Sequence, residues 1–398
     1  MTLVAHTRRL DHDVDLLSIA GAEGFLLARD GIGLAGRGVA LEVDVEDDAE
    51  AQAVLAAVAR DTEVDGPGTG VVAFGAWPFL PGRPRRLTVP EVVVGRDDRG
   101  TRWVTTIGEA DAGPVLGADD PPLVLPEQVT VRATQSADEW CGSVEAARAA
   151  IRAGDLRKVV LARELVVGAD RGIDALGVLR RLAAAFPGCM LAQVDGFLAA
   201  SPETLVARHG DVVRSHPLAG TAPRGGDPAA DSRLAAGLLA SAKDRAEHQV
   251  TIDFVHDTLL PWCSFLDEEA EPSIVGVANV QHLGTMVEGR LSDPAPSVLE
   301  LVSALHPTPA VGGDPRDEAL ALIGTLEPGD RGRYAGPVGW VDGEGNGRWA
   351  VGIRSAELDG AEARLWAGVG IVADSDPAAE LEETRAKAQA MLGALVRL

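Results

Sequence analysis

Residues 190–217, MLAQVDGFLAASPETLVARHGDVVRSHP, form several short apolar segments in succession, each typical of a β-strand. A helical pattern at residues 174–186 precedes this stretch, and a longer one at 231–260 follows it. Strands that follow one another in this way pair antiparallel, whereas strands that alternate with helices form parallel sheets. The stretch therefore predicts an α+β fold rather than a doubly wound sheet.

The same grouping continues outward along the chain. Upstream, residues 136–152 begin with the capping box Ser136-Ala-Asp-Glu139 and predict a helix, which a strand at 158–168 follows immediately. Downstream, a helix is predicted at 377–396. Further strands are expected at 274–291, 336–342, 348–358 and 362–373. Residues 1–130 are also rich in strand patterns, and we assign them to the same domain as residues 131–398.

The charge of the chain excludes some partners. The 398 residues include 36 Lys and Arg against 60 Asp and Glu, a net charge of −24. Such a surface repels nucleic-acid phosphates and anionic lipid headgroups, so we expect neither nucleic acid nor a membrane as partner. Any site for an anionic substrate must be locally basic or must recruit a cation.

Cysteine usage and hydropathy indicate the compartment. The three cysteines, Cys141, Cys189 and Cys263, are too few and too widely spaced for a disulfide framework or a zinc knuckle. No run of 18 apolar residues occurs, and charges interrupt the apolar start of the chain. We expect a cytoplasmic protein.

One segment matches a nucleotide-binding motif in its letters but not in its predicted secondary structure. Gly31-Ile-Gly33-Leu-Ala-Gly36 matches the dinucleotide fingerprint, but the residues after it alternate as a strand, where that fingerprint needs a helix. A hairpin turn is the better interpretation. The sequence also has no P-loop, no nucleophile elbow and no H-E-x-x-H motif.

Two predicted helices carry paired carboxylates. Asp244 and Glu247 share a helix face, and Glu380 and Glu383 repeat their spacing. Glu383 and Lys387 alone would suit a solvated ion pair. Together, however, the four carboxylates could make a site built only from oxygen atoms, which suits Mg²⁺.

Three other positions place polar groups beside apolar strands. Lys158 begins a buried strand, where a lysine can lose hydration and serve as a base, although it could equally be an exposed edge residue. Glu203 follows an apolar strand, where burial would raise its pKa as a general acid requires, although it could simply cap a turn. Arg354 interrupts an apolar strand and needs an anionic partner.

Taken in order, nine segments resemble the chorismate-utilising enzymes. They are KVVLAR, SPETLV, HPLAGTAPRG, KDRAEH, NVQHLGT, LHPTPAVGG, RGRYAGPVGW, IRSAEL and AGVGIVADSDPAAELEET, and they span about residues 140–398. The resemblance implies a single large α+β domain of two antiparallel sheets flanked by helices, with residues 131–398 as the chorismate-binding catalytic region. It also implies Mg²⁺ as the cofactor.

The resemblance further implies roles for individual residues. Lys158 would be the base that activates water, and Glu203 the acid that protonates the leaving oxygen. Glu247 and Glu383 would hold Mg²⁺ against the ring carboxylate, with Asp244 completing its shell. The other implied metal-shell residue is Glu380, and the implied substrate-binding positions are Gly220, Thr221, His282, Tyr334, Arg354, Gly368, Gly370 and Lys387.

Within this family the residues favour isochorismate synthase. Lys158 stands where water-using members carry lysine. Ala219 stands where aminodeoxychorismate synthases that bond covalently to the substrate carry their lysine. His216 stands where salicylate synthases usually show Glu, but salicylate synthase, which also eliminates pyruvate, stays an alternative. An inactive chorismate-binding regulatory subunit is the alternative of another class. We expect a monomer without an amidotransferase subunit, serving menaquinone or siderophore biosynthesis.

Overall fold

The computed structural model describes residues 3–116, 126–277 and 280–396. Its strands pair antiparallel apart from β1 and β5, which run parallel, and they form two large sheets and a small third one. This confirms the α+β class. The third sheet was not expected, and it supplies part of the functional site.

The first sheet joins both ends of the chain. In order, its strands are β10 (Val129–Ala133), β11 (Lys158–Ala169), β25 (Glu362–Ile371), β24 (Ser355–Asp359), β13 (Phe197–Ser201), β12 (Met190–Val194), β2 (Phe25–Arg29), β3 (Ile32–Arg37), β8 (Val92–Arg96), β9 (Arg102–Ile107), β1 (Val4–Arg9) and β5 (Ala59–Thr62), with β21 (Gly313–Asp314) beside β11. Strands from the N-terminal part of the chain, such as β2 and β3, therefore lie in the same sheet as β24 and β25 from the C-terminal part.

The second and third sheets are built in the same antiparallel manner. The second has the order β17 (Cys263–Glu268), β20 (Val287–Leu291), β15 (Val212–His216), β14 (Thr204–His209), β23 (Gly347–Val351), β22 (Pro337–Asp342), β6 (Val72–Ala76), β7 (Arg86–Val89) and β4 (Leu41–Asp44). The third has the order β16 (Leu218–Pro223), β19 (Val280–Gly284) and β18 (Ser273–Val277). The expected strand run 274–291 appears as β18, β19 and β20, and residues 278 and 279 lie outside the described part.

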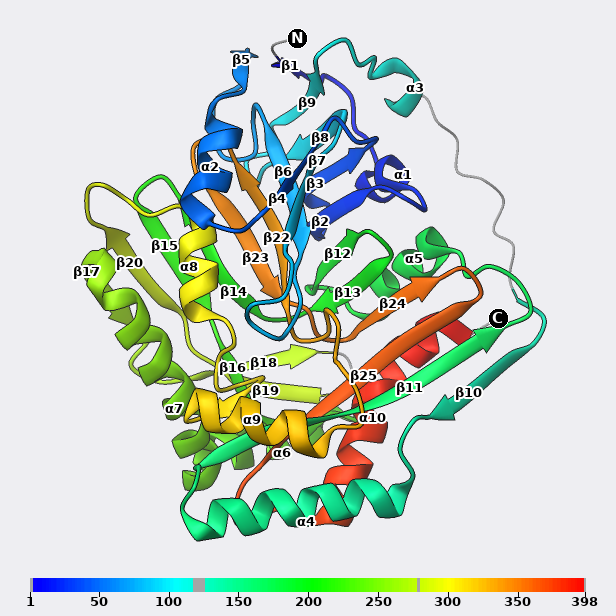
Figure 1. The fold of residues 1–398 in the computed structure, drawn as a ribbon, viewed down its shortest axis with the longest axis vertical. Helices are drawn as coiled ribbons and strands as arrows, with labels where there is room; N and C mark the ends of the chain where they lie inside the picture. Colours follow the sequence, from blue (N-terminus) through cyan, green and yellow to red (C-terminus); the bar gives the residue numbers. More distant parts are fainter. Residues whose placement is uncertain (1–2, 117–125, 278–279, 397–398) are drawn as a thin grey trace.

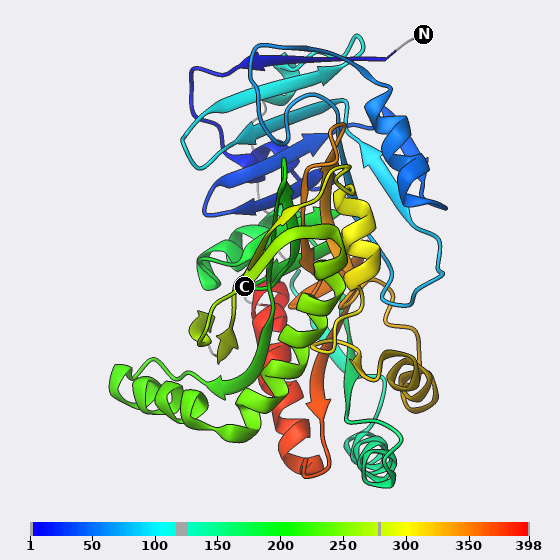
Figure 2. The same ribbon diagram turned by 90° about the vertical axis from the view of Figure 1, so that its left-hand side faces the viewer.

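Helices lie at both ends of the sheets, and most of the long ones gather at one end (Figure 1). They are α1 (Leu16–Ala20), α2 (Asp48–Ala56), α3 (Gly113–Leu116), α4 (Ala137–Ala153), α5 (Ala175–Ala185), α6 (Pro228–Ala240), α7 (Ala242–Leu259), α8 (Val298–Leu305), α9 (Arg316–Leu326) and α10 (Pro377–Val396), with a 3₁₀ turn at Leu260–Trp262. Figures 1 and 2 show the N-terminal strands at the top and α4, α6, α7 and α10 at the bottom.

Two predicted elements are broken. The helix expected at 231–260 is α6 and α7, because Ser241 adopts an extended conformation and its side chain accepts a hydrogen bond from the Asp244 amide, which caps α7. The strand expected at 348–358 is β23 and β24. Arg354 has a positive φ of 49°, and the chain there leaves the second sheet for the first. Both breaks place side chains that the sequence predicts for the site.

Aromatic side chains fill the space between the two large sheets. Phe25 and Phe197 from the first sheet meet Phe74 from the second, and the Phe25 and Phe74 rings stack with centroids 5.6 Å apart. All three side chains are almost fully buried, and burying a side chain of this size is worth about 1.5–3 kcal/mol. The packed layer holds the sheets together above the helical end.

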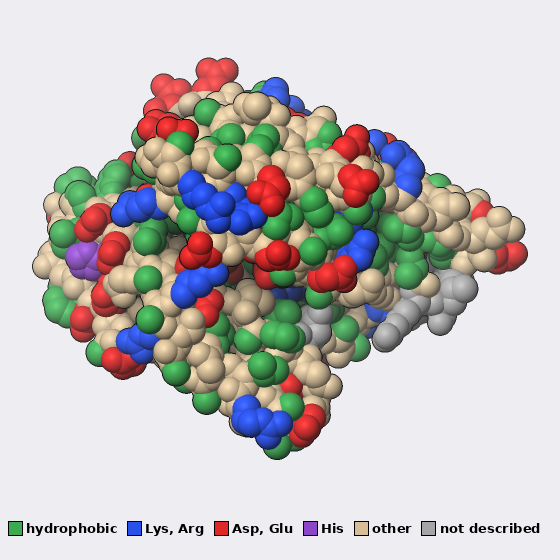
Figure 3. Space-filling view, turned by 90° about the horizontal axis from the view of Figure 1, so that it is seen from below, with side chains coloured by type: hydrophobic (Ala, Val, Ile, Leu, Met, Phe, Trp, Pro, Cys, Tyr) green, Lys and Arg blue, Asp and Glu red, His purple; other side chains and the backbone are tan. Residues whose placement is uncertain are grey.

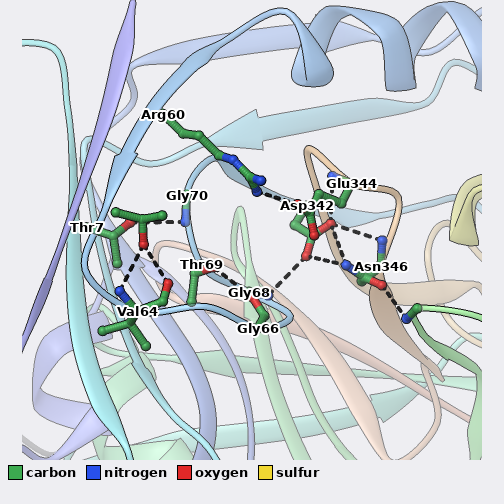
Figure 4. Close-up of polar contacts among 12 residues, drawn as sticks. Thr7, Arg60, Val64, Gly66, Gly68, Thr69, Gly70, Asp342, Glu344 and Asn346 are labelled. Carbon is green, nitrogen blue, oxygen red and sulfur yellow. Dashed lines mark hydrogen bonds and ion pairs between the residues drawn. The ribbon is translucent and has the colours of Figure 1, made fainter.

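A buried carboxylate ties an N-terminal loop to this framework. Asp342, at the end of β22, accepts hydrogen bonds from the amides of Gly68, Glu344 and Asn346 and from the Asn346 side chain (Figure 4). The Asn346 side chain in turn accepts from the Gly210 amide at 2.7 Å. Two distant segments, at Gly68 and at Gly210, are thereby fixed to the β22–β23 turn.

Candidate active site

The structure brings together every site residue predicted from the sequence. The cavity lies where β11 and β25 meet the third sheet and the helices α7 and α10. Its lining includes Lys158, Glu203, Gly220, Thr221, Asp244, Glu247, His282, Tyr334, Arg354, Gly368, Gly370, Glu380, Glu383 and Lys387. Residues more than two hundred positions apart in the sequence thus share one space, although their chemical roles stay predictions.

Lys158 begins β11 and is only 6% exposed. Its ammonium group donates a hydrogen bond to the Glu247 carboxylate of α7, with Nζ and Oε1 2.7 Å apart. Burial raises the pKa of Glu247, but the charge and hydrogen bond of Lys158 outweigh burial, and the pKa lies below its ordinary value. A Cβ at Gly370 would lie 2.9 Å from Lys158 Cε, so glycine there lets the lysine cross β25.

Glu203 lies in the tight turn between β13 and β14. The Ser201 hydroxyl accepts a hydrogen bond from the Glu203 amide and donates one to its carbonyl, which holds the turn in place. The Glu203 side chain is buried. Burial raises its pKa to about 8, against the opposing effects of a backbone hydrogen bond from Leu218 and the charges of Lys158 and Arg354. At neutral pH this carboxyl carries a proton that it can donate.

Arg354 points into the cavity from the break between β23 and β24. Its Nη2 donates to Nε2 of His282 at 3.0 Å, and Nδ1 of His282 lies 3.0 Å from the Gly220 carbonyl. Because Nε2 accepts, Nδ1 must carry the hydrogen, so the imidazole is neutral. Burial and the charge of Arg354 accordingly lower the pKa of His282 to about 3.

Among the described residues, the Arg354 guanidinium forms no ion pair. It is 9% exposed, and its Nη1 atom is buried without a hydrogen-bond partner among the residues that the structure describes. A buried guanidinium is expensive unless an anion pairs with it. The cavity is therefore suited to a ligand that carries a carboxylate.

Tyr334 and Lys387 hold the Gly368 peptide from both sides. The Tyr334 hydroxyl oxygen accepts from the Gly368 amide at 2.7 Å, and Lys387 Nζ donates to the Gly368 carbonyl at 3.0 Å. A Cβ at Gly368 would lie 2.9 Å from the hydroxyl oxygen. Burial raises the pKa of Tyr334, so its O–H stays protonated and can donate to a ligand.

The predicted metal carboxylates face the same cavity from two helices. Glu383 on α10 pairs with Lys387 at 2.7 Å, as Glu247 on α7 pairs with Lys158. Burial and then the charge of Glu383 raise the pKa of Glu380. Within residues 3–116, 126–277 and 280–396, no three His, Cys, Asp or Glu side chains form a ready metal cluster. Oxygen donors in two separated pairs nevertheless suit Mg²⁺, which needs only one or two carboxylates besides water and substrate.

Sequence reasoning missed several lining residues. Lys243 immediately precedes Asp244, and Trp366 lies on β25 and stacks on Tyr334 with ring centroids 6.0 Å apart. Because Lys243 adjoins Asp244, a predicted metal-shell residue, the sequence could have indicated that it lines the same site. Arg331, which also lines the cavity, begins the segment RGRYAGPVGW, but the sequence predicted no role for it.

Basic side chains gather in the cavity beside the acidic ones. Acidic and basic side chains are interspersed over the face seen in Figure 3, with no broad patch of one sign. Lys158, Lys243, Arg354 and Lys387, in contrast, all face one cavity of a chain with net charge −24. Acidic side chains line the same cavity, namely Glu203, Asp244, Glu247, Glu380 and Glu383. With Glu203 protonated and the Arg354 Nη1 atom unpartnered among the described residues, the cavity nevertheless opposes an anion less than the surface of the chain does. Among the described helices, none has both the length and the apolar character to cross a membrane.

Comparisons with known proteins agree with this geometry. A family model described as chorismate binding enzyme matches residues 88–396. The isochorismate synthase DhbC of Bacillus subtilis is 38% identical over 353 residues, covering 86% of this chain and 84% of its own. The vibriobactin-specific isochorismate synthase of Vibrio cholerae is 35% identical, covering 87% and 83%. The solved menaquinone-specific isochorismate synthase MenF of Escherichia coli superposes with a TM-score of 0.83 over 99% of this chain and 94% of its own, at 24% identity, and so shares the fold.

Proposed function

Since the chain belongs to the family of chorismate-binding enzymes, we propose that it is an isochorismate synthase. The reaction adds water at C2 of the chorismate ring and releases the C4 hydroxyl. The observation that carries the proposal is a buried acid and a buried lysine in one cavity. Burial raises the pKa of Glu203 to about 8, and Lys158 lines the same cavity from the start of β11.

The chain's own groups divide the chemistry between them. Lys158, as the neutral amine it would become once Glu247 binds the metal instead, accepts a proton from the attacking water. Glu203 donates one to the departing oxygen, because hydroxide alone leaves poorly. Each such general acid–base contribution is worth about 10²–10⁴ in rate. Arg354 and the Tyr334 hydroxyl bind the enolpyruvyl carboxylate, which a planar guanidinium can hold by two hydrogen bonds.

The metal belongs to the same proposal. Glu247 and Glu383 would hold Mg²⁺, with Asp244 and Glu380 completing its shell through water. When bound, Mg²⁺ neutralises the ring carboxylate of the substrate. Both ligands are carboxylates of the kind that a hard cation prefers, and each now has a lysine as its counter-ion.

A product assay tests the function directly. The protein is incubated with chorismate and Mg²⁺, and isochorismate, salicylate, anthranilate and pyruvate are separated. We expect isochorismate without pyruvate, and we expect Lys158→Ala to lower turnover about 10²–10⁴-fold with the fold intact. Salicylate with equimolar pyruvate would identify a salicylate synthase. Chorismate binding without any product would identify an inactive subunit.

Metal dependence has its own test. Glu247→Gln and Glu383→Gln should each raise the Mg²⁺ concentration for half-maximal activity about tenfold or more, because each removes a charged ligand. The matched control is Glu382→Gln, since Glu382 neighbours Glu383 on α10 but is exposed and pairs with Arg385. Binding of Mn²⁺, followed by its electron paramagnetic resonance signal, gives the same comparison without turnover. Activity that survives EDTA would refute the metal assignment.

A further inference from the structure

One edge of β11 lacks a continuous strand partner. Along its other edge, β25 pairs with residues 159–168. On the incomplete edge, β21 pairs with Lys158 and Val159, and β10 pairs with residues 165–169. The backbone between these two partners lies directly beyond Lys158, so whatever completes it also supports that lysine.

A buried ion pair occupies this gap. Arg331 and Glu327 are joined by two hydrogen bonds, Nε to Oε2 at 2.9 Å and Nη2 to Oε1 at 2.5 Å, and their side chains are 2% and 6% exposed. Arg331 Nη2 also donates to the Val160 carbonyl at 2.6 Å, and Glu327 Oε1 accepts from the Ala162 amide at 2.7 Å. The pair thus makes the hydrogen bonds that a neighbouring strand would otherwise make.

Arg331 contacts two other walls of the cavity, one through its guanidinium and one through its backbone. The Arg331 Nη1 atom donates to the Val311 carbonyl at 3.0 Å. The backbone carbonyl of Arg331 accepts from the Tyr334 amide, also at 3.0 Å. Val160, Val311 and Tyr334 all line the cavity. Arg331 therefore connects the strand of Lys158, the turn at 308–312 and the turn that carries Tyr334.

Stability alone does not account for this arrangement. A buried ion pair often contributes little net stability, because desolvation offsets the attraction between the charges. An apolar pair of similar volume, however, would leave the Val160 and Val311 carbonyls and the Ala162 amide unpaired in the interior. The charged pair provides partners for all three of these backbone groups at once.

We propose that Glu327 and Arg331 are positioning residues for the reaction, and this inference rests on the proposed function. They hold the strand of Lys158 against the turn at 308–312. Although Arg331 lines the cavity, all three of its guanidinium nitrogens are engaged with Glu327 or with backbone carbonyls. A misplacement of about 1 Å in a reacting group can cost about 10² in rate. Weakening the pair should therefore reduce kcat more than it raises KM.

Arg331→Lys is the principal test. Lysine keeps the positive charge but offers a point charge, which cannot span Glu327, Val160 and Val311 together. We expect kcat to fall about 10–100-fold while KM for chorismate changes less than fivefold. Arg333→Lys is the matched control, because Arg333 pairs with Glu357 and donates to the Val194 carbonyl but lies outside the cavity lining. It should keep kcat within about twofold.

Glu327→Gln provides a milder second variant, because its amide oxygen can still accept from Ala162. In the double variant, kcat should be no lower than in the worse single variant, since the two residues act as a unit. Thermal unfolding of each variant, with kcat expressed per folded molecule, separates positioning from folding. A lowered unfolding temperature with wild-type kcat would overturn the inference, as would multiplicative losses in the double variant. A wild type that forms no isochorismate overturns the proposed function and this inference together, whereas an active wild type matched by Arg331→Lys overturns this inference alone.

Discussion

Two carboxyl groups are buried to nearly the same extent in different parts of the molecule, but their surroundings differ. Glu203 in the cavity is 3% exposed, and Asp342 at the β22–β23 turn is 2% exposed. Four donor groups converge on the Asp342 carboxylate (Figure 4). Burial raises the pKa of Glu203. Only one backbone hydrogen bond, from Leu218, and the charges of Lys158 and Arg354 oppose this rise.

The difference shows that burial alone does not decide what a carboxyl group does. Burial is the largest influence in both cases and raises both pKa values. The converging donors limit the pKa of Asp342 to about 6, whereas that of Glu203 rises to about 8. Near pH 7 Asp342 is therefore mostly an anion that anchors loops, and Glu203 is a protonated acid that faces a cavity.

The largest expected effect is at Glu203. Glu203→Gln keeps the size of the side chain but removes the transferable proton, so kcat should fall about 10²–10⁴-fold with the fold retained. Steady-state kinetics and thermal unfolding measure the two properties separately. A kcat within tenfold of the wild-type value would show that Glu203 is buried without being the acid, and the contrast with Asp342 would lose its functional meaning.

Asp342→Asn tests the other carboxyl group, where the expected effect is on stability rather than on activity. Both carboxylate oxygens accept hydrogen bonds, so whichever one becomes an amide nitrogen must face an N–H group. We expect a loss of about 1–3 kcal/mol in the free energy of unfolding, measured with urea, and unchanged kcat per folded molecule. Asp359→Asn, at the exposed end of β24, serves as the control. Lost activity in a stable Asp342→Asn protein would mean that the anchor and the cavity are coupled.

The two carboxyl groups also differ in how far the sequence could predict them. Glu203 follows an apolar strand inside a motif that the resemblance covers, and the structure places it in the expected cavity. Asp342 lies in VDGEGNG, which signals only a turn, because its burial depends on Gly68, 274 residues away. The sequence likewise predicted the strand groups and the helix at 136–152, since local patterns determine them.

Features that depend on contacts between distant segments were missed for the same reason. The apolar residues around Arg354 predict a continuous strand, and only the change of sheet at that point explains its left-handed backbone. The third sheet depends on β16 meeting β19, about sixty residues later. The buried Glu327–Arg331 pair also escaped notice, because the two residues gain their importance from β11, far earlier in the chain.

The smallest expected effect is on pH dependence, and it compares the two groups directly. Model Asp and Glu side chains titrate near 3.9 and 4.3, so both folded pKa values are raised and both protonated forms favour the folded state. The stability that each contributes is complete below about pH 4. It is lost as pH rises through about 6 for Asp342 and about 8 for Glu203.

Activity should follow only one of these titrations. Because the acid must be protonated, kcat/KM, which reports the free enzyme, should fall to about half near pH 8 and show no step from Asp342 near pH 6. Urea unfolding from pH 4 to 9 should show stability falling in both windows, with Asp342→Asn removing the lower one and Glu203→Gln the upper one. A step in kcat/KM near pH 6 that Asp342→Asn abolishes would reverse the assignment, because the anchor would then be titrating with the chemistry.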